Sequence, residues 1–173
     1  LIGRGHAERL VPMVADLLGG RRPSRILVGC GPGSFTGLRV GIAAAHGMAV
    51  GWNAELLGVS SLALLAAGAP GAGSVAAAII GGHGELFIQQ FTREPLRVDG
   101  PLLNLPPTDA AAAVTAPLVV GSGATALVEA REYGEALDLL PTAANAADLP
   151  LEARSLPPRP IYARAPDARP KAA

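Results

Sequence analysis

The groups that could do chemistry concentrate in one glycine-rich stretch, residues 28–41, VGCGPGSFTGLRVG. Such a turn between an apolar strand and a helix presents free backbone N–H groups at the start of the helix, where a phosphate could bind. The details do not match the common phosphate binders or nucleophile turns. The only lysine is Lys171, the glycines are not at dinucleotide-binding spacing, and Ser34 lacks a glycine two residues away on either side. We interpret the stretch as a structural turn, with an anion or nucleotide contact as the alternative.

The turn itself is assigned to Gly31, Pro32, Gly33, Ser34, Thr36 and Gly37. At least one of its glycines is expected at positive φ, because a Pro-Gly turn of type II requires it. Ser34 or Thr36 is available to cap the helix that follows.

The remaining reactive side chains form no recognisable site. His6, His46 and His83 lie far apart in the sequence and show no metal-ligand spacing. Cys30, beside the turn, is expected to be a small buried apolar side chain rather than a nucleophile. The acidic residues occur singly, so no carboxylate pair indicates acid–base catalysis. No catalytic, cofactor-binding or metal-ligating residue is therefore assigned.

The composition is typical of a folded domain with balanced charge. The 173 residues are 50% apolar and 16% charged, with 14 basic and 14 acidic side chains. This excludes a disordered chain and argues against a broad basic surface that binds nucleic acid alone. A single cysteine excludes an internal disulfide. Glycines, serines and a proline interrupt the long uncharged run at residues 56–82, so no membrane helix is expected and a cytoplasmic location is predicted.

Helix and strand patterns alternate along the chain, which predicts an α/β layered fold. The predicted helices are residues 6–18, 38–50, a short helix capped by Ser60 that ends at Ala67, 108–114 and 124–133. The predicted strands are 26–28, 75–80, 86–91, 102–105 and 118–120, with a hairpin turn at 81–84. Residues 56–59 are interpreted as a strand or a connector. Residues 150–173 are rich in proline and are expected to hold no regular structure, wrapping the surface or remaining disordered.

The helix predicted over residues 38–50 carries many small residues. Gly37, Gly41, Ala45 and Ala49 recur every four residues, so one ridge bears almost no side chain. Glycine in a helix costs about 1 kcal/mol relative to alanine, and close packing of another helix is the expected compensation. Two interpretations remain open: packing within this chain, or a helix-to-helix interface with a partner chain.

Residues 31–41, GPGSFTGLRVG, resemble the signature of the TsaB family, also called YeaZ. Residues 6–13, HAERLVPM, are similar to the family's first helix. Residues 78–87, AIIGGHGELF, are similar to the hairpin that opens its second lobe, and residues 160–164, PIYAR, to its C-terminal segment. The likeness covers nearly the whole chain.

The resemblance implies an actin-like, sugar-kinase-like fold with a Gcp-like domain. Its layout would place a first lobe over residues 1–70, a second over 71–149 and a proline-rich C-terminal segment over 150–173. It also implies a non-catalytic subunit required for the threonylcarbamoyl modification of the tRNA adenosine next to the anticodon. In that system TsaD holds the metal and transfers the group, and a small ATPase, TsaE, joins the pair. ATP and metal are then expected only on the assembled complex, and tRNA contact only through it.

The chain departs from the family layout and from TsaD. Family members begin with an apolar strand hairpin, so the first lobe is expected to lack its N-terminal strands, about thirty residues. TsaD carries a His-x-Glu-x-His metal motif, and the corresponding stretch here is residues 61–65, SLALL. Leu65 occupies one ligand position and cannot bind a metal. The chain is therefore similar to a metal-less relative of the catalytic subunit.

The resemblance and the small-residue ridge together predict a partner face on the first two helices. The face would contact TsaD, or a second copy of this chain when it is alone. Its predicted members are His6, Leu10, Met13, Leu17, Gly37, Val40, Gly41, Ala44, Ala45 and Met48. The alternative function is a nucleotide-binding enzyme of the actin-like fold, which includes an older peptidase-like interpretation of the wider family. Tight ATP binding or turnover by the isolated chain would favour that alternative.

Alone, the chain is expected neither to hold zinc or iron stoichiometrically nor to modify tRNA, because its sequence offers no recognisable ligand set. Metal analysis after dialysis measures the first part of this expectation. One equivalent of metal that survives dialysis, and is lost when His6, His46 or His83 is replaced, would overturn it.

Overall fold

The computed structural model describes residues 6–163, and its elements follow the predicted alternation. The helices are α1 (His6–Leu18), α2 (Phe35–Trp52), α3 (Ser61–Ala67), α4 (Pro107–Ala113) and α5 (Ala124–Arg131). The strands are β1 (Arg25–Gly31), β2 (Glu55–Ser60), β3 (Gly73–Ile80), β4 (Leu86–Arg93), β5 (Arg97–Val98), β6 (Leu103–Leu105), β7 (Leu118–Val120) and β8 (Glu135–Leu137). Short 3-10 helices are η1 (Gly82–Gly84), η2 (Ala143–Asp148) and η3 (Leu151–Arg154). In the described part of the chain, no helix is long and apolar enough to cross a membrane.

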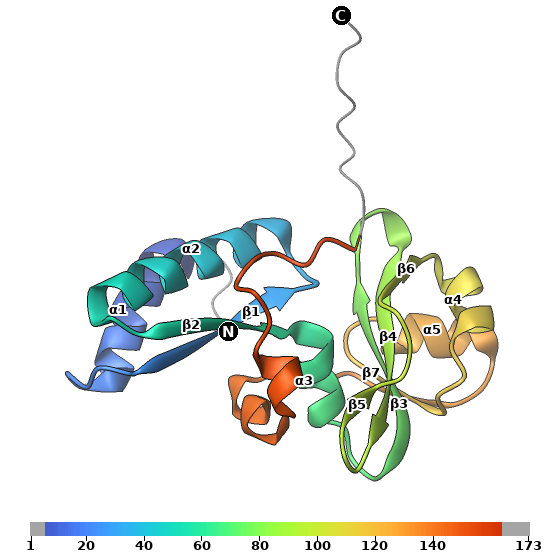
Figure 1. Ribbon diagram of the computed structural model, residues 1–173. Helices are drawn as coiled ribbons and strands as arrows, with labels where there is room; N and C mark the ends of the chain where they lie inside the picture. Colours follow the sequence, from blue (N-terminus) through green and yellow to red (C-terminus); the bar gives the residue numbers. More distant parts are fainter. Residues whose placement is uncertain (1–5, 164–173) are drawn as a thin grey trace, which may run out of the picture.

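The strands form two sheets, of which the first is parallel and the second is mixed. In the first, β1 and β2 pair in parallel, with Arg25 opposite Glu55. The second has the order β5-β4-β3-β7-β8, and β6 also pairs with β4. Its β3–β4 pair is the predicted antiparallel hairpin, with Ile80 opposite Leu86, whereas β7 runs parallel to β3 and to β8. In Figure 1, α1 and α2 lie over one face of the first sheet, and α4 and α5 lie beside the second. The division at residue 70 into two lobes stays a prediction.

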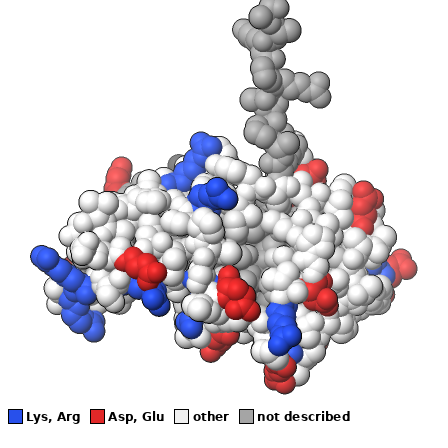
Figure 2. Space-filling view, viewed as in Figure 1, with Lys and Arg blue, Asp and Glu red and all other residues white. Residues whose placement is uncertain are grey.

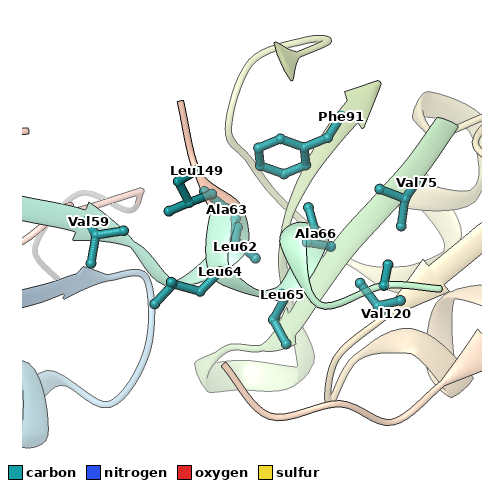
Figure 3. Close-up of a cluster of buried hydrophobic side chains, with 12 residues drawn as sticks. Val59, Leu62, Ala63, Leu64, Leu65, Ala66, Val75, Phe91, Val120 and Leu149 are labelled. Atoms are coloured by element: carbon teal, nitrogen blue, oxygen red, sulfur yellow. The ribbon is translucent and has the colours of Figure 1, made fainter. Parts of the chain in front are cut away.

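The largest core forms around α3, between the two sheets. Ser60 caps this helix, since its Oγ accepts a hydrogen bond from the N–H of Ala63 at 3.4 Å. The five residues 62–66 are all buried, so the helix is covered on every side. Figure 3 shows its leucines among apolar side chains that come from β2, β3, β4, β7 and the segment before η3. Packing of α3 thus joins elements from both sheets.

The chain after Pro150 holds more structure than its prolines predict. Leu151–Arg154 forms η3, and Leu156 makes an antiparallel bridge with Gly58 of β2. Pro150 precedes η3, where a fixed φ and a missing N–H cost little, so proline here starts a helical turn rather than preventing one. The expectation of no regular structure is therefore wrong for this part. Residues 164–173 of the proline-rich segment, like residues 1–5, lie outside the described residues.

The close approach of this C-terminal segment to β2 depends on Gly58. A Cβ atom at Gly58 would lie 2.5 Å from Sγ of Cys30, 2.8 Å from the carbonyl oxygen of Pro157 and 3.1 Å from that of Leu156. The N–H of Gly58 donates to the carbonyl of Leu156 at 2.6 Å, and the N–H of Leu156 donates back at 3.1 Å. Because two of the three atoms that a Cβ would meet are backbone oxygens, they could not rotate away.

We expect Gly58→Ala to lower the free energy of unfolding by about 1–3 kcal/mol, because the added methyl group overpacks this contact. The matched control is Gly47→Ala on α2, where an added Cβ would meet nothing within 4 Å. Alanine is the better helix former, so the control should gain up to about 1 kcal/mol. Urea unfolding followed by circular dichroism measures both. Equal stability of the two variants would show that the C-terminal segment is not held against Gly58.

Candidate functional site

The glycine turn ends β1, and α2 begins directly after it. Gly31 has a φ of 99°, and a Cβ there would meet Cδ1 of Leu38 at 2.7 Å. The expected positive φ is thus confirmed, but it falls before Pro32 and not at Gly33, so the turn is not the Pro-Gly type II turn that was expected. Ser34 is the cap: its Oγ accepts a hydrogen bond from the N–H of Gly37 at 3.3 Å. The helix therefore starts at Phe35, three residues before the predicted start.

A cavity of about 320 Å³ lies beside the turn. Its walls are Pro32, Gly33, Ser34, Gly37, Leu38, Ser61, Leu65, Ile79, Ser122, Leu139, Leu140 and Pro141. None of these side chains is charged, so the lining offers no carboxylate for a divalent cation and no cation for a phosphate. Two of its hydroxyls are already engaged, Ser34 as the cap of α2 and Ser122 as the acceptor for the N–H of Ile80 at 3.2 Å. The residues present do not fit a metal–nucleotide complex.

Residues 61–65, which the resemblance places opposite the metal motif of TsaD, lie in α3. Leu65 is 1% exposed and belongs to the core around this helix. Ser61 is half-buried at the first position of the helix. Among residues 6–163, no three side chains of the His, Cys, Asp or Glu type come together. His46 contacts the carbonyl oxygen of Pro158 at 3.3 Å, and His83 is exposed in η1, so the structure does not bring these two histidines to one site.

Cys30 is fully buried at the end of β1, as the sequence suggested. Desolvation by burial raises the pKa of its thiol, while hydrogen bonds with the backbone of Val59 and Arg159 lower it. The net direction is upward, so the thiol stays protonated at neutral pH and packs as a small apolar group. Its Sγ lies 3.6 Å from the carbonyl oxygen of Pro157, in the contact that Gly58 permits.

The predicted partner face is only partly open. On α1, Met13 is 52% and Leu17 is 79% exposed. On α2, a Cβ at Gly41 would meet nothing within 4 Å, and a Cβ at Gly37 would meet only the Ser34 side chain. The half-buried members of the predicted face are Leu10, Gly37, Val40, Gly41, Ala44 and Met48. The side chain of His6, at the start of α1, lies outside what the structure describes.

Ala45 requires a correction, because it is only 2% exposed and packs in a core with Val28, Cys30 and Ile42. The reason is the geometry of the ridge. Residues four apart are displaced by about 40° around a helix with 3.6 residues per turn, so a ridge of three such steps winds about 120° around the axis. Ala45 and Ala49 therefore reach the sheet side of α2, whereas Gly37 and Gly41 stay on an open side. Packing within the chain explains the alanines but not the glycines.

Both helices also expose apolar residues that the sequence analysis did not assign to the predicted face. α1 and α2 contact each other over the first sheet (Figure 1). Val11, Phe35 and Val50 are 46%, 57% and 84% exposed, and none was assigned to the partner face. The available signal was that α2 is apolar nearly all round, which requires cover on more than one side. The open glycines and these apolar side chains lie on the same two helices.

A second surface feature brings together residues far apart in the sequence. Cζ of Arg39 lies 3.7 Å above the ring centroid of Phe35, and its Nη2 donates to Oη of Tyr162 at 3.2 Å. The ring centroids of Phe35 and Tyr162 are 6.3 Å apart. More than 100 residues separate Arg39 from Tyr162, so no local pattern could have indicated the contact. We refer to Phe35, Arg39 and Tyr162 as the aromatic–arginine cluster.

Comparison with solved structures defines the class of protein. One structure from Pseudomonas aeruginosa, described as an uncharacterized protein with similarity to peptidase YeaZ, superposes with a TM-score of 0.76 at 33% identity, covering 94% of this chain and 86% of that one. A second, described as YeaZ from the same species, gives 0.75 at 32% identity, covering 91% and 85%. Residues 1–100 match the family model described as TsaD, tRNA N6-adenosine threonylcarbamoyltransferase. The fold is the actin-like α/β fold with mixed sheets.

Sequence relatives narrow the class to one family. A protein of Escherichia coli K12 named TsaB is 40% identical over 102 residues, which are 54% of this chain and 44% of that protein. The Haemophilus influenzae TsaB is 36% identical over 107 residues, 57% and 45% of the two chains. The matches thus span less than half of these two named relatives. An uncharacterized protein of Mycobacterium tuberculosis H37Rv is 35% identical over 180 residues, 98% of this chain and 80% of that protein. The chain belongs to the TsaB (YeaZ) family.

Proposed function

We propose that this chain is a non-catalytic scaffold subunit in tRNA threonylcarbamoyladenosine biosynthesis and that it acts by dimerising with TsaD. The E. coli and H. influenzae relatives are both named tRNA threonylcarbamoyladenosine biosynthesis protein TsaB, which supports a role in that modification. The observation that carries the scaffold role is the open side of α2 at Gly41, together with the exposed apolar side chains of α1, the helix that contacts α2.

The chemistry of this surface favours a helical partner. Met13 and Leu17 expose more than half of their side chains to water, which is costly for a surface that stays uncovered. A glycine without neighbours lets a second helix approach toward the close end of the usual interaxial range, about 8 Å. A pair of helices from TsaD would cover both features at once. A second copy of this chain would do the same when TsaD is absent.

The absence of catalytic work in this subunit is supported by two features of the described residues. Leu65 places a buried apolar side chain where TsaD carries a metal ligand, and the cavity at the glycine turn has no charged side chain. The same two features weigh against the alternative of a nucleotide-binding enzyme. We assign ATP and metal to the assembled complex, with TsaE as its further member. The tRNA reaches this chain only within the complex, and the site of action is the cytoplasm.

Gly41→Leu is expected to weaken association with TsaD by about 1–3 kcal/mol or more, because the added side chain forces the facing helices apart. The free chain should fold normally. Nothing lies within 4 Å of an added Cβ, and leucine is the better helix former by about 1 kcal/mol. Pull-down with TsaD and a thermal melt of the free variant measure the two effects.

Ala43→Leu is the matched control on the same helix. Ala43 is exposed and lies two residues further along, about 200° around the axis from Gly41. This variant should bind TsaD as the parent does. Normal binding by Gly41→Leu would place the interface elsewhere. A lowered melting temperature of the free Gly41→Leu chain would mean that Gly41 packs internally.

A further inference from the structure

The aromatic–arginine cluster remains exposed after its internal contacts are made. Phe35 is 57% and Tyr162 is 58% exposed, although Arg39 lies over one ring and hydrogen-bonds the hydroxyl of the other. Nε and Nη2 of Arg39 both point to Oη of Tyr162, at 3.4 and 3.2 Å. The guanidinium is thus held in place by an aromatic ring and a hydroxyl, neither of which neutralises its charge.

The chain around the cluster carries no acidic residue. None occurs between Asp16 and Glu55, the stretch that contains the glycine turn and α2, and none between Glu152 and Asp167. Among the residues that the structure describes, neither Arg39 nor the exposed Arg159 belongs to an ion pair. Figure 2 shows basic side chains gathered on the upper surface, over α2 in the orientation of Figure 1. Positive potential at this place is therefore not cancelled locally, although the whole chain has zero net charge.

We propose that the aromatic–arginine cluster is a contact for an unpaired stretch of RNA. A base stacks on the exposed ring of Phe35, and the neighbouring phosphate accepts hydrogen bonds from Arg39, assisted by the charge of Arg159. Single-stranded loops of RNA are recognised in this way, because their bases are free to stack on aromatic rings and arginine planes. The inference rests on the proposed function in one respect, since it takes the RNA to be the tRNA that the complex modifies.

A purely structural role for the cluster would be to fasten the C-terminal segment to α2, and we call this role the clip. It would explain the hydrogen bond from Arg39 to the hydroxyl of Tyr162 but not the exposure of the two rings. The clip needs the hydroxyl of Tyr162 on Arg39, which fastens the C-terminal segment to α2. It does not need an open aromatic face on Phe35, at the first position of α2. The two roles therefore separate by substitution: removal of the hydroxyl tests the clip, and removal of the aromatic face tests RNA contact.

The experiment measures binding of a transcribed tRNA, with an adenosine directly 3′ of its anticodon, to the complex of this chain with TsaD. Fluorescence anisotropy at several salt concentrations gives the affinity and its salt slope. Phe35→Leu keeps an apolar side chain but loses the π face, and should weaken tRNA binding about five- to a hundredfold. Phe35→Tyr restores a ring and should bind as the parent does. Arg39→Gln should reduce the slope of log K against log salt by about 0.7, the value for one phosphate contact on a single strand.

Two controls isolate the contact. Tyr162→Phe removes the clip hydroxyl but keeps the ring, and should leave the affinity for tRNA within about twofold, provided that the segment stays in place. Arg22→Gln removes the same charge as Arg39→Gln at an exposed position before β1. The seven residues of β1 separate the two arginines by about 20 Å, so its salt slope should be that of the parent.

Parent-like tRNA affinity of Phe35→Leu in an intact complex would overturn the inference and leave the scaffold role standing. Loss of TsaD association by Phe35→Leu, with a normal melt of the free chain, would also overturn it, because the cluster would then belong to the protein interface. The inference would also be overturned if the parent chain forms the complex with TsaD but that complex binds no tRNA. Failure of the parent to associate with TsaD at all would overturn the proposed function and this inference together.

Discussion

The arrangement of the first sheet, β1 and β2, depends on the contact between Gly58 and the C-terminal segment. Because Gly58 has no side chain, the carbonyls of Leu156 and Pro157 reach β2 and the thiol of Cys30. Beyond this point the N–H of Ile161 donates to the carbonyl of Cys30 at 2.8 Å, and the chain continues to Tyr162 at the aromatic–arginine cluster. The end of β1 and the start of α2 are therefore held by residues from the other end of the sequence.

α2 connects this contact to the partner surface because its two sides differ. Ile42, Ala45 and Ala49 are buried on the sheet side, and their packing fixes the helix on β1 and β2. Gly37 and Gly41 lie on another side, where a Cβ at Gly41 would meet nothing within 4 Å and a Cβ at Gly37 would meet only the Ser34 side chain. One helix thus supports the fold with its larger side chains and leaves room for a second helix where side chains are missing.

Local sequence patterns were sufficient to predict most of the helices and strands but not the tertiary contacts between them. Apolar periodicity and caps predicted the bounds of α1 and β7, and Ser60 as the cap of α3, because these depend on neighbours in the sequence. β5 and β8 were missed because most of their residues are exposed and form no apolar run, unlike the three apolar residues of β7. The burial of Ala45 and the pairing of Arg39 with Tyr162 depend on tertiary placement, so no window of the sequence contains them. The partner face was predicted from the resemblance, the small-residue ridge and the apolar residues of α1, none of which reveals how a ridge winds around its helix.

The central claim is that α1 and the open side of α2 form the face that TsaD covers. Hydrogen–deuterium exchange of this chain, measured with and without TsaD, tests the claim at the level of peptides. The account predicts slower amide exchange in α1 and in the first half of α2 when TsaD is present, with β3 and β4 unchanged. Protection of the second sheet, with α1 and α2 exchanging as they do in the free chain, would contradict it.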